Sequence, residues 1–336
     1  MADASGQRAT IAAIARAAKV SPATVSKVWN GRSDVSEATR QRVEALLREH
    51  DYRARATRAP ASAGVIDVVF PELDCDWEGE HIRGIEAVGR AAGVRTVVSS
   101  LERGGAAQRQ LVSRLRAGRT DGVILAGVTG AGPLVAVLRR MGVPVVGLEP
   151  ARSAAPDLPA VDAANWAGAR IATRHLLGLG HRRIAVITGV DQLLCSRARL
   201  DGFFAAHDEF GVSPDPGLIE RGDFDFPSGV AAGGRLLDRP DPPTAVFACS
   251  DHMALGVYEA ARRRRVPIPG RLSVVGFDDL PAARWAAPPL TTVLQPLRAM
   301  GRLAAETILA LAGAGPAPGR SRLDTELVVR SSTASR

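Results

Sequence analysis

The sequence predicts a small all-α domain at the N-terminus followed by a larger α/β core. Three observations carry this prediction. Residues 10–52 show helical spacing of apolar residues behind the helix-start residues Thr10, Ser21 and Ser36. From Val65 onward, short Val/Ile/Leu runs alternate with amphipathic helices, which is typical of parallel sheets covered on both faces. A chain of 336 residues is also too long for one ordinary hydrophobic core.

Positive charge is concentrated in the N-terminal domain. The net formal charge is +8, and in the first 60 residues 11 Lys and Arg stand against 6 Asp and Glu. A polyanion is therefore the first partner to consider, with a solvated basic face as the alternative. No apolar run is long enough to span a membrane, and "MADASGQRAT" lacks the pattern of a signal peptide. We expect a cytoplasmic protein with no membrane partner.

Catalytic and metal-binding patterns are missing from the sequence. Cys75, Cys195 and Cys249 are odd in number and far apart, so we expect them to be reduced and mostly buried. The six histidines do not have zinc spacing. The motifs GxSxG, GxxxxGK[ST], HExxH and GxGxxG do not occur. We expect a protein that is not an enzyme and that has no cofactor and no metal.

Two helices that meet across a short turn open the chain. Thr10 is placed to cap the first helix, and Ser21 followed by Pro22 is a strong start for the second. We expect the second helix to turn Val25 and Val28 inward and its polar side toward solvent. The apolar stripe of the first helix consists of Ile11, Ile14, Ala15 and Ala18.

A third helix is predicted in "SEATRQRVEALLREHDY", behind a Ser36 cap. Three short helices with one small aliphatic core match a helix-turn-helix. The small and hydroxyl-bearing residues of the second helix would let its backbone approach base edges in a major groove. The alternative is a helical domain that docks on another protein.

The stretch "TIAAIARAAKVSPATVSKVWNGRSDVSEATRQRVEALLREHDY" resembles the DNA-binding headpiece of the lac repressor and galactose repressor family. Ala13, Lys19 and Trp29 depart from the family pattern, and Lys19 stands at the position of a turn glycine. The resemblance implies that one set of residues reads bases and another holds phosphates. The base-reading set is Pro22, Ala23 and Lys27, and the phosphate set is Thr10, Ser21, Thr24, Ser26 and Asn30.

The linker after Tyr52 departs from the same family. Members usually form a hinge helix whose Leu wedges into the minor groove, but this chain has "RARATRAPASAG", with Pro60 inside the hinge and Ala61 at the wedge position. We expect minor-groove contacts from arginines instead, with a flexible linker as the alternative. These arginines are Arg53, Arg55 and Arg58. The predicted headpiece is 8–56 and the atypical hinge is 57–63.

The predicted core, 64–330, contains two doubly wound subdomains. Strands are expected at 65–70, 94–100, 121–127, 143–148, 183–189, 244–250 and 271–277, and helices at 78–92, 105–117, 165–179, 198–210 and 251–265. We expect "PPLTTVLQP" to return the chain to the first sheet. The N-subdomain would then be 64–161 plus 292–322, and the C-subdomain 162–291 plus 323–330.

The core also resembles the same family, in which it is similar to a periplasmic sugar-binding protein. The motifs "NWAGARIATRHLLGLGHRRIAVITG", "SRARLDGFFAA", "ACSDHMALGVYEAARRRRVPIPGRLSVVGFDDLP" and "PPLTTVLQPLRAMG" follow in order. Ala164 replaces a family Asp before Asn165, and Asp162 is a candidate substitute. The resemblance implies that the ligand is bound by Asp74, Trp77, Arg199, Phe224, Ser250, Asp251, Asp278 and Gln295. Three of these residues have an alternative role: Arg199 could pair with a surface acid, Phe224 could belong to the hydrophobic core, and Trp77 could serve a dimer interface.

Together these resemblances imply a transcriptional repressor that binds a pseudo-palindromic DNA operator as a homodimer. A small sugar in the cleft between the subdomains would change operator affinity. The stretch "VFPELDCDWEGEHIRGIEAV" further resembles family members that respond to xylose-type sugars or xylo-oligosaccharides. The alternatives are a cytoplasmic sugar-binding protein and an architectural DNA-binding protein.

Overall fold

The computed structural model describes residues 11–29, 35–49, 64–101, 105–117, 120–152, 157–315 and 319–336. The chain forms two compact units, Met1–Ala61 and Ser62–Arg336. The first is the headpiece and the second is the α/β core. No helix in these ranges is both long and apolar enough to cross a membrane.

The headpiece consists of three short helices around one aliphatic core. They are α1 (Ile11–Ala17), α2 (Pro22–Trp29) and α3 (Glu37–Glu49). Val25 and Val28 of α2 are buried as predicted, and they pack with Ile14 of α1 and Val43 of α3. The helix-turn-helix that the residue pattern predicts is confirmed.

The first sheet of the core has strand order β11-β5-β4-β3-β1-β2, and all its pairings are parallel. Its helices cover both faces, so the inner strands β1, β3 and β4 are almost entirely buried, as near-continuous Val/Ile/Leu runs require, whereas the edge strands β2 and β11 are partly exposed. The strands are β1 (Val65–Phe70), β2 (Arg95–Ser100), β3 (Gly122–Ala126), β4 (Val145–Leu148), β5 (Ala160–Ala163) and β11 (Arg320–Leu323). The helices are α4 (Asp76–Ala91), α5 (Gly105–Ala117), α6 (Gly132–Arg140) and α12 (Leu297–Ala312).

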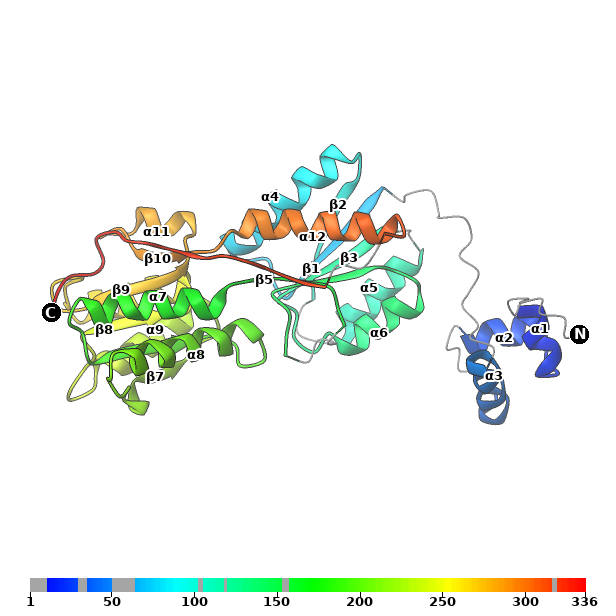
Figure 1. Ribbon diagram of the computed structural model, residues 1–336, viewed down its shortest axis with the longest axis horizontal. Coiled ribbons are helices and arrows are strands. Elements are labelled where there is room, and N and C mark those ends of the chain that lie inside the picture. The colour runs from blue at the N-terminus through cyan, green and yellow to red at the C-terminus, as the bar shows by residue number, and fades with distance from the viewer. Residues whose placement is uncertain are drawn as a thin grey trace, which may run out of the picture. The chain divides into compact units, whose positions relative to one another are not determined.

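The second sheet repeats this plan with strand order β12-β10-β9-β8-β6-β7. In Figure 1, its strands β8, β9 and β10 are yellow to orange, and its helices α7 and α8 are green. Only the β10–β12 pairing is antiparallel among the pairings seen here. The strands are β6 (Ile184–Thr188), β7 (Ile219–Arg221), β8 (Ala245–Ala248), β9 (Ser273–Asp278), β10 (Thr291–Leu294) and β12 (Glu326–Val328). The helices are α7 (Asn165–Gly178), α8 (Leu194–Glu209), the short 3-10 helix η1 (Pro216–Leu218), α9 (Phe226–Leu237), α10 (Asp251–Arg263) and α11 (Pro281–Trp285).

Three connections cross between the two sheets. The chain leaves the first sheet after β5, returns after β10, and leaves again after β11. The predicted boundary at 291/292 is therefore wrong, because β10 pairs with β9 and β12 in the second sheet. Residues 162 and 163, predicted in the C-subdomain, belong to β5, and Leu323 belongs to β11 of the first sheet. The return to the first sheet begins only at Gln295.

The returning helix α12 packs very closely on α4. A Cβ atom at Gly84 would lie 2.0 Å from the Arg298 carbonyl oxygen, and one at Gly301 would lie 2.3 Å from the His81 carbonyl oxygen. Both glycines are therefore needed for the backbones to approach. In addition, His81 Nδ1 lies 2.9 Å from the Leu297 carbonyl oxygen, so this contact fixes the start of α12 against the first sheet.

Candidate functional site

Helix α2 presents a polar face outside the headpiece core. The Thr24 N–H donates to Ser21 Oγ (3.1 Å), and the two side-chain hydroxyl oxygens lie 2.9 Å apart, so Ser21 caps the helix. Pro22, Ala23 and Lys27 are exposed, while Thr24 and Ser26 are half-buried. The three residues that the family resemblance assigns to base reading thus lie on the surface of one short helix.

The turn before α2 contains a backbone conformation that L-residues avoid. Lys19 has φ of +54°, in the left-handed region, at the position where the family pattern has glycine. Such a conformation costs a non-glycine residue about 1 kcal/mol. The predicted DNA contacts Thr10, Asn30, Arg53, Arg55 and Arg58 lie outside the described residues. So does the whole predicted hinge, 57–63.

In the core, the predicted ligand residues follow the carboxyl ends of parallel strands. Ligands of open α/β sheets gather at this edge. Asp278 is the last residue of β9, and Gln295 directly follows β10. The others follow β1 (Asp74, Trp77), β6 (Arg199, in α8), β7 (Phe224) and β8 (Ser250, Asp251).

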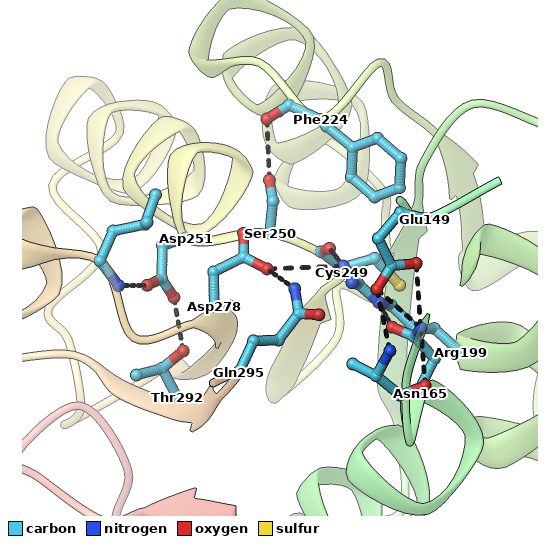
Figure 2. A network of polar contacts seen from close by, with 12 residues as sticks. Glu149, Asn165, Arg199, Phe224, Cys249, Ser250, Asp251, Asp278, Thr292 and Gln295 are labelled. Carbon is cyan, nitrogen blue, oxygen red and sulfur yellow. Dashed lines mark hydrogen bonds and ion pairs between the residues drawn. The ribbon is translucent and has the colours of Figure 1, made fainter. Parts of the chain in front are cut away.

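Arg199 is the centre of a buried polar network (Figure 2). Its side chain donates from Nε to Asn165 Oδ1 (2.8 Å) and from Nη1 to the Cys249 carbonyl oxygen (2.5 Å). Nη1 also lies 3.8 Å from Asp278 Oδ1, and Cζ lies 3.8 Å from the Phe277 ring centroid. Arg199 is only 3% exposed, so its partners are buried side chains and not a surface acid. We call Glu149, Asn165, Arg199, Asp278 and Gln295 the arginine cluster.

Glu149 and Asn165 follow strands β4 and β5 of the first sheet, and Asn165 is the first residue of α7. Glu149 follows β4 with φ of +48° and is 3% exposed. Its carboxylate accepts from the Ala163 N–H (3.2 Å) and from Asn165 Nδ2 (3.3 and 3.2 Å). Burial raises the pKa of Glu149 to about 7, although the Arg199 charge opposes this shift. Asn165 thereby joins a carboxyl group of the first sheet to the arginine that follows β6.

The second sheet contributes Asp278 and Gln295. Gln295 Nε2 donates to Asp278 Oδ1 (2.5 Å). Burial raises the pKa of Asp278 to about 6, against the opposing effects of Arg199 and Gln295. Asp278 has φ of +119°, a strained backbone of the kind that gathers at functional sites. Gln295 Oε1 is buried and has no hydrogen-bond partner among the residues that the structure describes.

Ser250 and Phe224 are joined by one hydrogen bond. Ser250 Oγ donates to the Phe224 carbonyl oxygen (2.9 Å) and accepts from the Met253 N–H (3.1 Å), which caps α10. The Phe224 ring packs over Gly189, where a Cβ would come within 1.9 Å of it, and lies 5.5 Å from Arg199 Cζ. Phe224 is half-buried beside the arginine cluster, and Ser250 holds its backbone in place.

Asp251 does not have the role that the sequence predicted. It is completely buried, and its two oxygens accept from the Leu280 N–H (2.7 Å) and from Thr292 Oγ1 (2.5 Å). Burial raises its pKa well above the ordinary value. In Figure 2, it lies on the far side of Asp278 from Arg199. Asp251 therefore holds the ends of β9 and β10 together and does not offer a free oxygen to a ligand.

Asp74 and Trp77 lie at the start of α4, outside the arginine cluster. Asp74 is exposed, and Trp77 is half-buried with its ring edge-on to Phe70 (6.1 Å between centroids) and His81 (4.5 Å). Burial lowers the pKa of His252 in α10, while the charges of Asp76 and Asp74 raise it. The start of α4 therefore lies within electrostatic range of α10, although the structure joins neither predicted residue directly to the arginine cluster.

A cavity of about 610 Å³ adjoins the arginine cluster. Asp278 and Gln295 line it together with residues of α11 and of the start of α12, among them Trp285, Leu297 and Arg298. Its volume is within the range of small-molecule sites in proteins. Asp162, the substitute expected for the missing family Asp, lies elsewhere, in β5 beside Arg320 and Arg322 of β11.

One group of side chains in the described ranges has spacing that could suit a metal, with ligand atoms of Asp74, Cys75 and Glu78 within 4.8 Å of one another. Its geometry is explained by helix capping, because Glu78 Oε2 accepts from the Cys75 N–H (3.1 Å). Burial raises the pKa of the Cys75 thiol, which disfavours the thiolate that metals need. That the protein binds no metal stays a prediction.

Two family descriptions match the chain. "Bacterial regulatory proteins, lacI family" matches residues 10–54, and "Periplasmic binding protein-like domain" matches residues 173–333. Curated relatives include the HTH-type transcriptional repressor CytR of Escherichia coli (strain K12), which is 34% identical over 332 residues, covering 97% of this chain and 96% of CytR. The HTH-type transcriptional regulator CelR of Thermobifida fusca is 35% identical over 335 residues, covering 97% and 98%.

Solved structures agree with these relatives. A CelR–cellobiose complex has a TM-score of 0.76 and 34% identity, covering 97% of this chain and all of that one. A lac repressor dimer bound to operator and an anti-inducer has a TM-score of 0.73 and 29% identity, covering 98% of this chain and all of that one. These relatives are transcriptional regulators and not enzymes. The chain belongs to the lacI family of bacterial regulatory proteins and is a DNA-binding transcriptional regulator.

Proposed function

We propose that this protein is a repressor that binds a pseudo-palindromic operator as a homodimer and changes its operator affinity when a small sugar binds beside the arginine cluster. The cluster is the observation that carries the proposal. It joins Glu149 and Asn165, which follow strands of the first sheet, to Arg199 and Asp278 of the second subdomain. A ligand that rearranges these contacts would change how the two sheets are held together.

The chemistry beside the cluster suits a sugar. Carboxylate and amide groups bind ring hydroxyls, and a half-buried aromatic ring such as Phe224 can stack on the apolar face of a pyranose. A relative, CelR, has been solved with cellobiose. We propose that the effector is a xylose-type sugar or a xylo-oligosaccharide. The basis for this proposal is the resemblance of the stretch "VFPELDCDWEGEHIRGIEAV", which contains Asp74 and Trp77, to family members that respond to such sugars.

On the DNA side, Lys27 would supply most of the direct readout. Pro22 and Ala23 have no side-chain donors and can offer only apolar contacts to thymine methyl groups. Ser21, Thr24 and Ser26 would hold phosphates, as would Thr10 and Asn30. Dimerisation places two α2 helices on two half-sites, because one three-helix headpiece buries too little surface for tight binding.

The proposal is tested by fluorescence-anisotropy titration of DNA from the gene's own upstream region, at fixed salt, with and without a panel of pentoses, hexoses and oligosaccharides. We expect specific binding that one sugar changes. Asp278→Ala should abolish the sugar response and leave operator affinity intact, whereas Asp208→Asn, a matched exposed aspartate of α8, should preserve both. Equal binding to random DNA with no sugar response would favour an architectural protein. Sugar binding without operator binding would favour a cytoplasmic sugar-binding protein.

A further inference from the structure

The arginine cluster holds more buried carboxyl groups than cations. Glu149 and Asp278 both act on the single guanidinium of Arg199 and are 3% and 6% exposed. Asp251, fully buried, acts electrostatically on Asp278 from the other side. The donors of Arg199 are directed at Asn165, Cys249 and Asp278. The cation of the cluster is therefore matched before any ligand arrives.

Three helix N-termini near the cluster, those of α4, α9 and α10, contain acidic or capping groups, whereas α7, α8, α11 and α12 begin without a side-chain cap or a first-turn acid. Free N–H groups at helix starts are a common place for phosphate to bind. Here Ser250 caps α10 and Asp251 stands in its first turn. Asp225 caps α9 by accepting from the Ser228 N–H (2.8 Å), and the first turn of α4 contains Asp76 and Glu78.

Further carboxylates lie at the starts of α4 and α9. His252 of α10 is half-buried, and the charges of Asp74, Asp76 and Asp225 all raise its pKa, although burial lowers it more strongly. Three carboxylates from the starts of α4 and α9 therefore act on one half-buried imidazole. The cavity beside Asp278 and Gln295 is also lined by Arg284 and Arg298, and these cations are paired with the carboxylates of Asp279 and Glu80.

The cluster contains a hydrogen-bond acceptor that a ligand could use. Gln295 Oε1 is buried, and no hydrogen-bond donor reaches it from the residues that the structure describes. Asp278 lines the cavity and accepts one hydrogen bond from Gln295 Nε2 at Oδ1, so its carboxyl group retains further acceptor capacity. Hydroxyl groups, which donate and carry no charge, fit this surface.

We propose that the effector is an uncharged, polyhydroxylated sugar and that the site rejects anionic sugars such as sugar phosphates, aldonates and uronates. This inference rests on the proposed sugar-sensing function and specifies its ligand class. Glu149 is the discriminating residue, because it adds a second buried carboxyl group to the pair formed by Arg199 and Asp278. Bringing a third anion into this environment would set three acidic groups against one guanidinium.

Isothermal titration calorimetry on the full-length protein tests this with matched pairs of ligands. The neutral members are D-xylose, D-glucose, xylobiose and cellobiose, and the anionic members are D-xylonate, D-glucuronate, D-glucose 6-phosphate and cellobionate. For whichever neutral sugar binds, we expect its anionic counterpart to bind at least about tenfold more weakly. Anionic members that bind as tightly as their neutral counterparts, or more tightly, would overturn the inference while leaving the sensor function standing.

Glu149→Gln separates charge from shape. The amide keeps the size of the side chain and removes its charge, so we expect the discrimination between D-glucose and D-glucuronate, or the corresponding pair, to fall by about tenfold or more. Glu306→Gln, an exposed glutamate of α12, is the matched control and should keep full discrimination. A Glu149→Gln protein that still binds the neutral sugar and discriminates as before would contradict the role of Glu149. If no member of either series binds the wild-type protein, the sugar-sensing proposal fails together with this inference.

Discussion

At the scale of single residues, the cluster depends on one arginine surrounded by groups that cannot reach water. Burying Arg199 alone would be costly, and the hydrogen bonds that it donates to Asn165 Oδ1 and the Cys249 carbonyl oxygen, with the charges of Asp278 and Glu149, offset that cost. The sequence predicted Arg199, Asp278 and Gln295 as site residues but not Glu149 or Asn165. The signal was present, because Glu149 is the first polar residue after the buried strand "VVGL".

Glu149 should make stability depend on pH. Its pKa is raised to about 7 in the folded protein from an ordinary value of 4.5, so the folded state binds the proton more tightly than the unfolded state. Stability is therefore lost as the pH rises from about 4.5 to 7. Glu149→Gln should remove this loss, which amounts to roughly 3 kcal/mol.

Urea unfolding of both proteins between pH 5 and 8 measures this difference. The free energy of unfolding of Glu149→Gln, minus that of the wild type, should increase with pH. A difference that stays constant over this range would mean that Glu149 is ionised in the folded protein with an ordinary pKa.

Lys27 makes a separate prediction at the DNA end. Because its side chain is exposed on α2 and the other base-reading candidates, Pro22 and Ala23, have no side-chain donors, Lys27→Ala should relax base preference at one or two operator positions by about 1–3 kcal/mol. Arg42→Ala, which removes an exposed cation from α3, should leave base preference unchanged. Anisotropy titrations against single-base operator variants measure both. An unchanged preference in Lys27→Ala would remove Lys27 from the base-reading set.

At the scale of elements, the periodicity of apolar residues predicted the strands and helices that the local sequence specifies. All seven predicted strands and all five predicted core helices occur, since each is a clear apolar run or an amphipathic stretch. The assignment of β10 failed because "TTVL" reads as a strand in either sheet, and only its pairing with β9 decides between them. The supporting position of Asp251 could not be predicted either, because its partners Leu280 and Thr292 are distant in sequence.

In the turn between α1 and α2, the residue type does not suit the backbone conformation. Lys19 has φ of +54°, which glycine adopts without strain. Lys19→Gly should stabilise the headpiece by about 1 kcal/mol, and Lys19→Ala, which keeps a Cβ, should not. Amide hydrogen exchange of α1–α3 in the full-length protein measures this. Faster exchange in Lys19→Gly than in Lys19→Ala would show that the turn is not strained.

At the scale of the whole molecule, the sequence predicted two units and a core of two sheets because each has its own apolar pattern. The arrangement of polar groups around Arg199 could not be predicted, since it is assembled from the ends of strands from both sheets. Three chain connections cross between the sheets at this place, so a ligand there acts on the part of the core that joins its two halves.

The central claim is that the sugar site and the DNA site are energetically coupled, and one linkage measurement tests it directly. The operator affinity is measured with and without saturating sugar, and the sugar affinity is measured with and without saturating operator. We predict that both ratios differ from one and equal each other, because coupling between two binding sites is reciprocal. If sugar and operator each bind and both ratios equal one, the two sites are independent, and this account of the protein as a sugar-controlled repressor is contradicted.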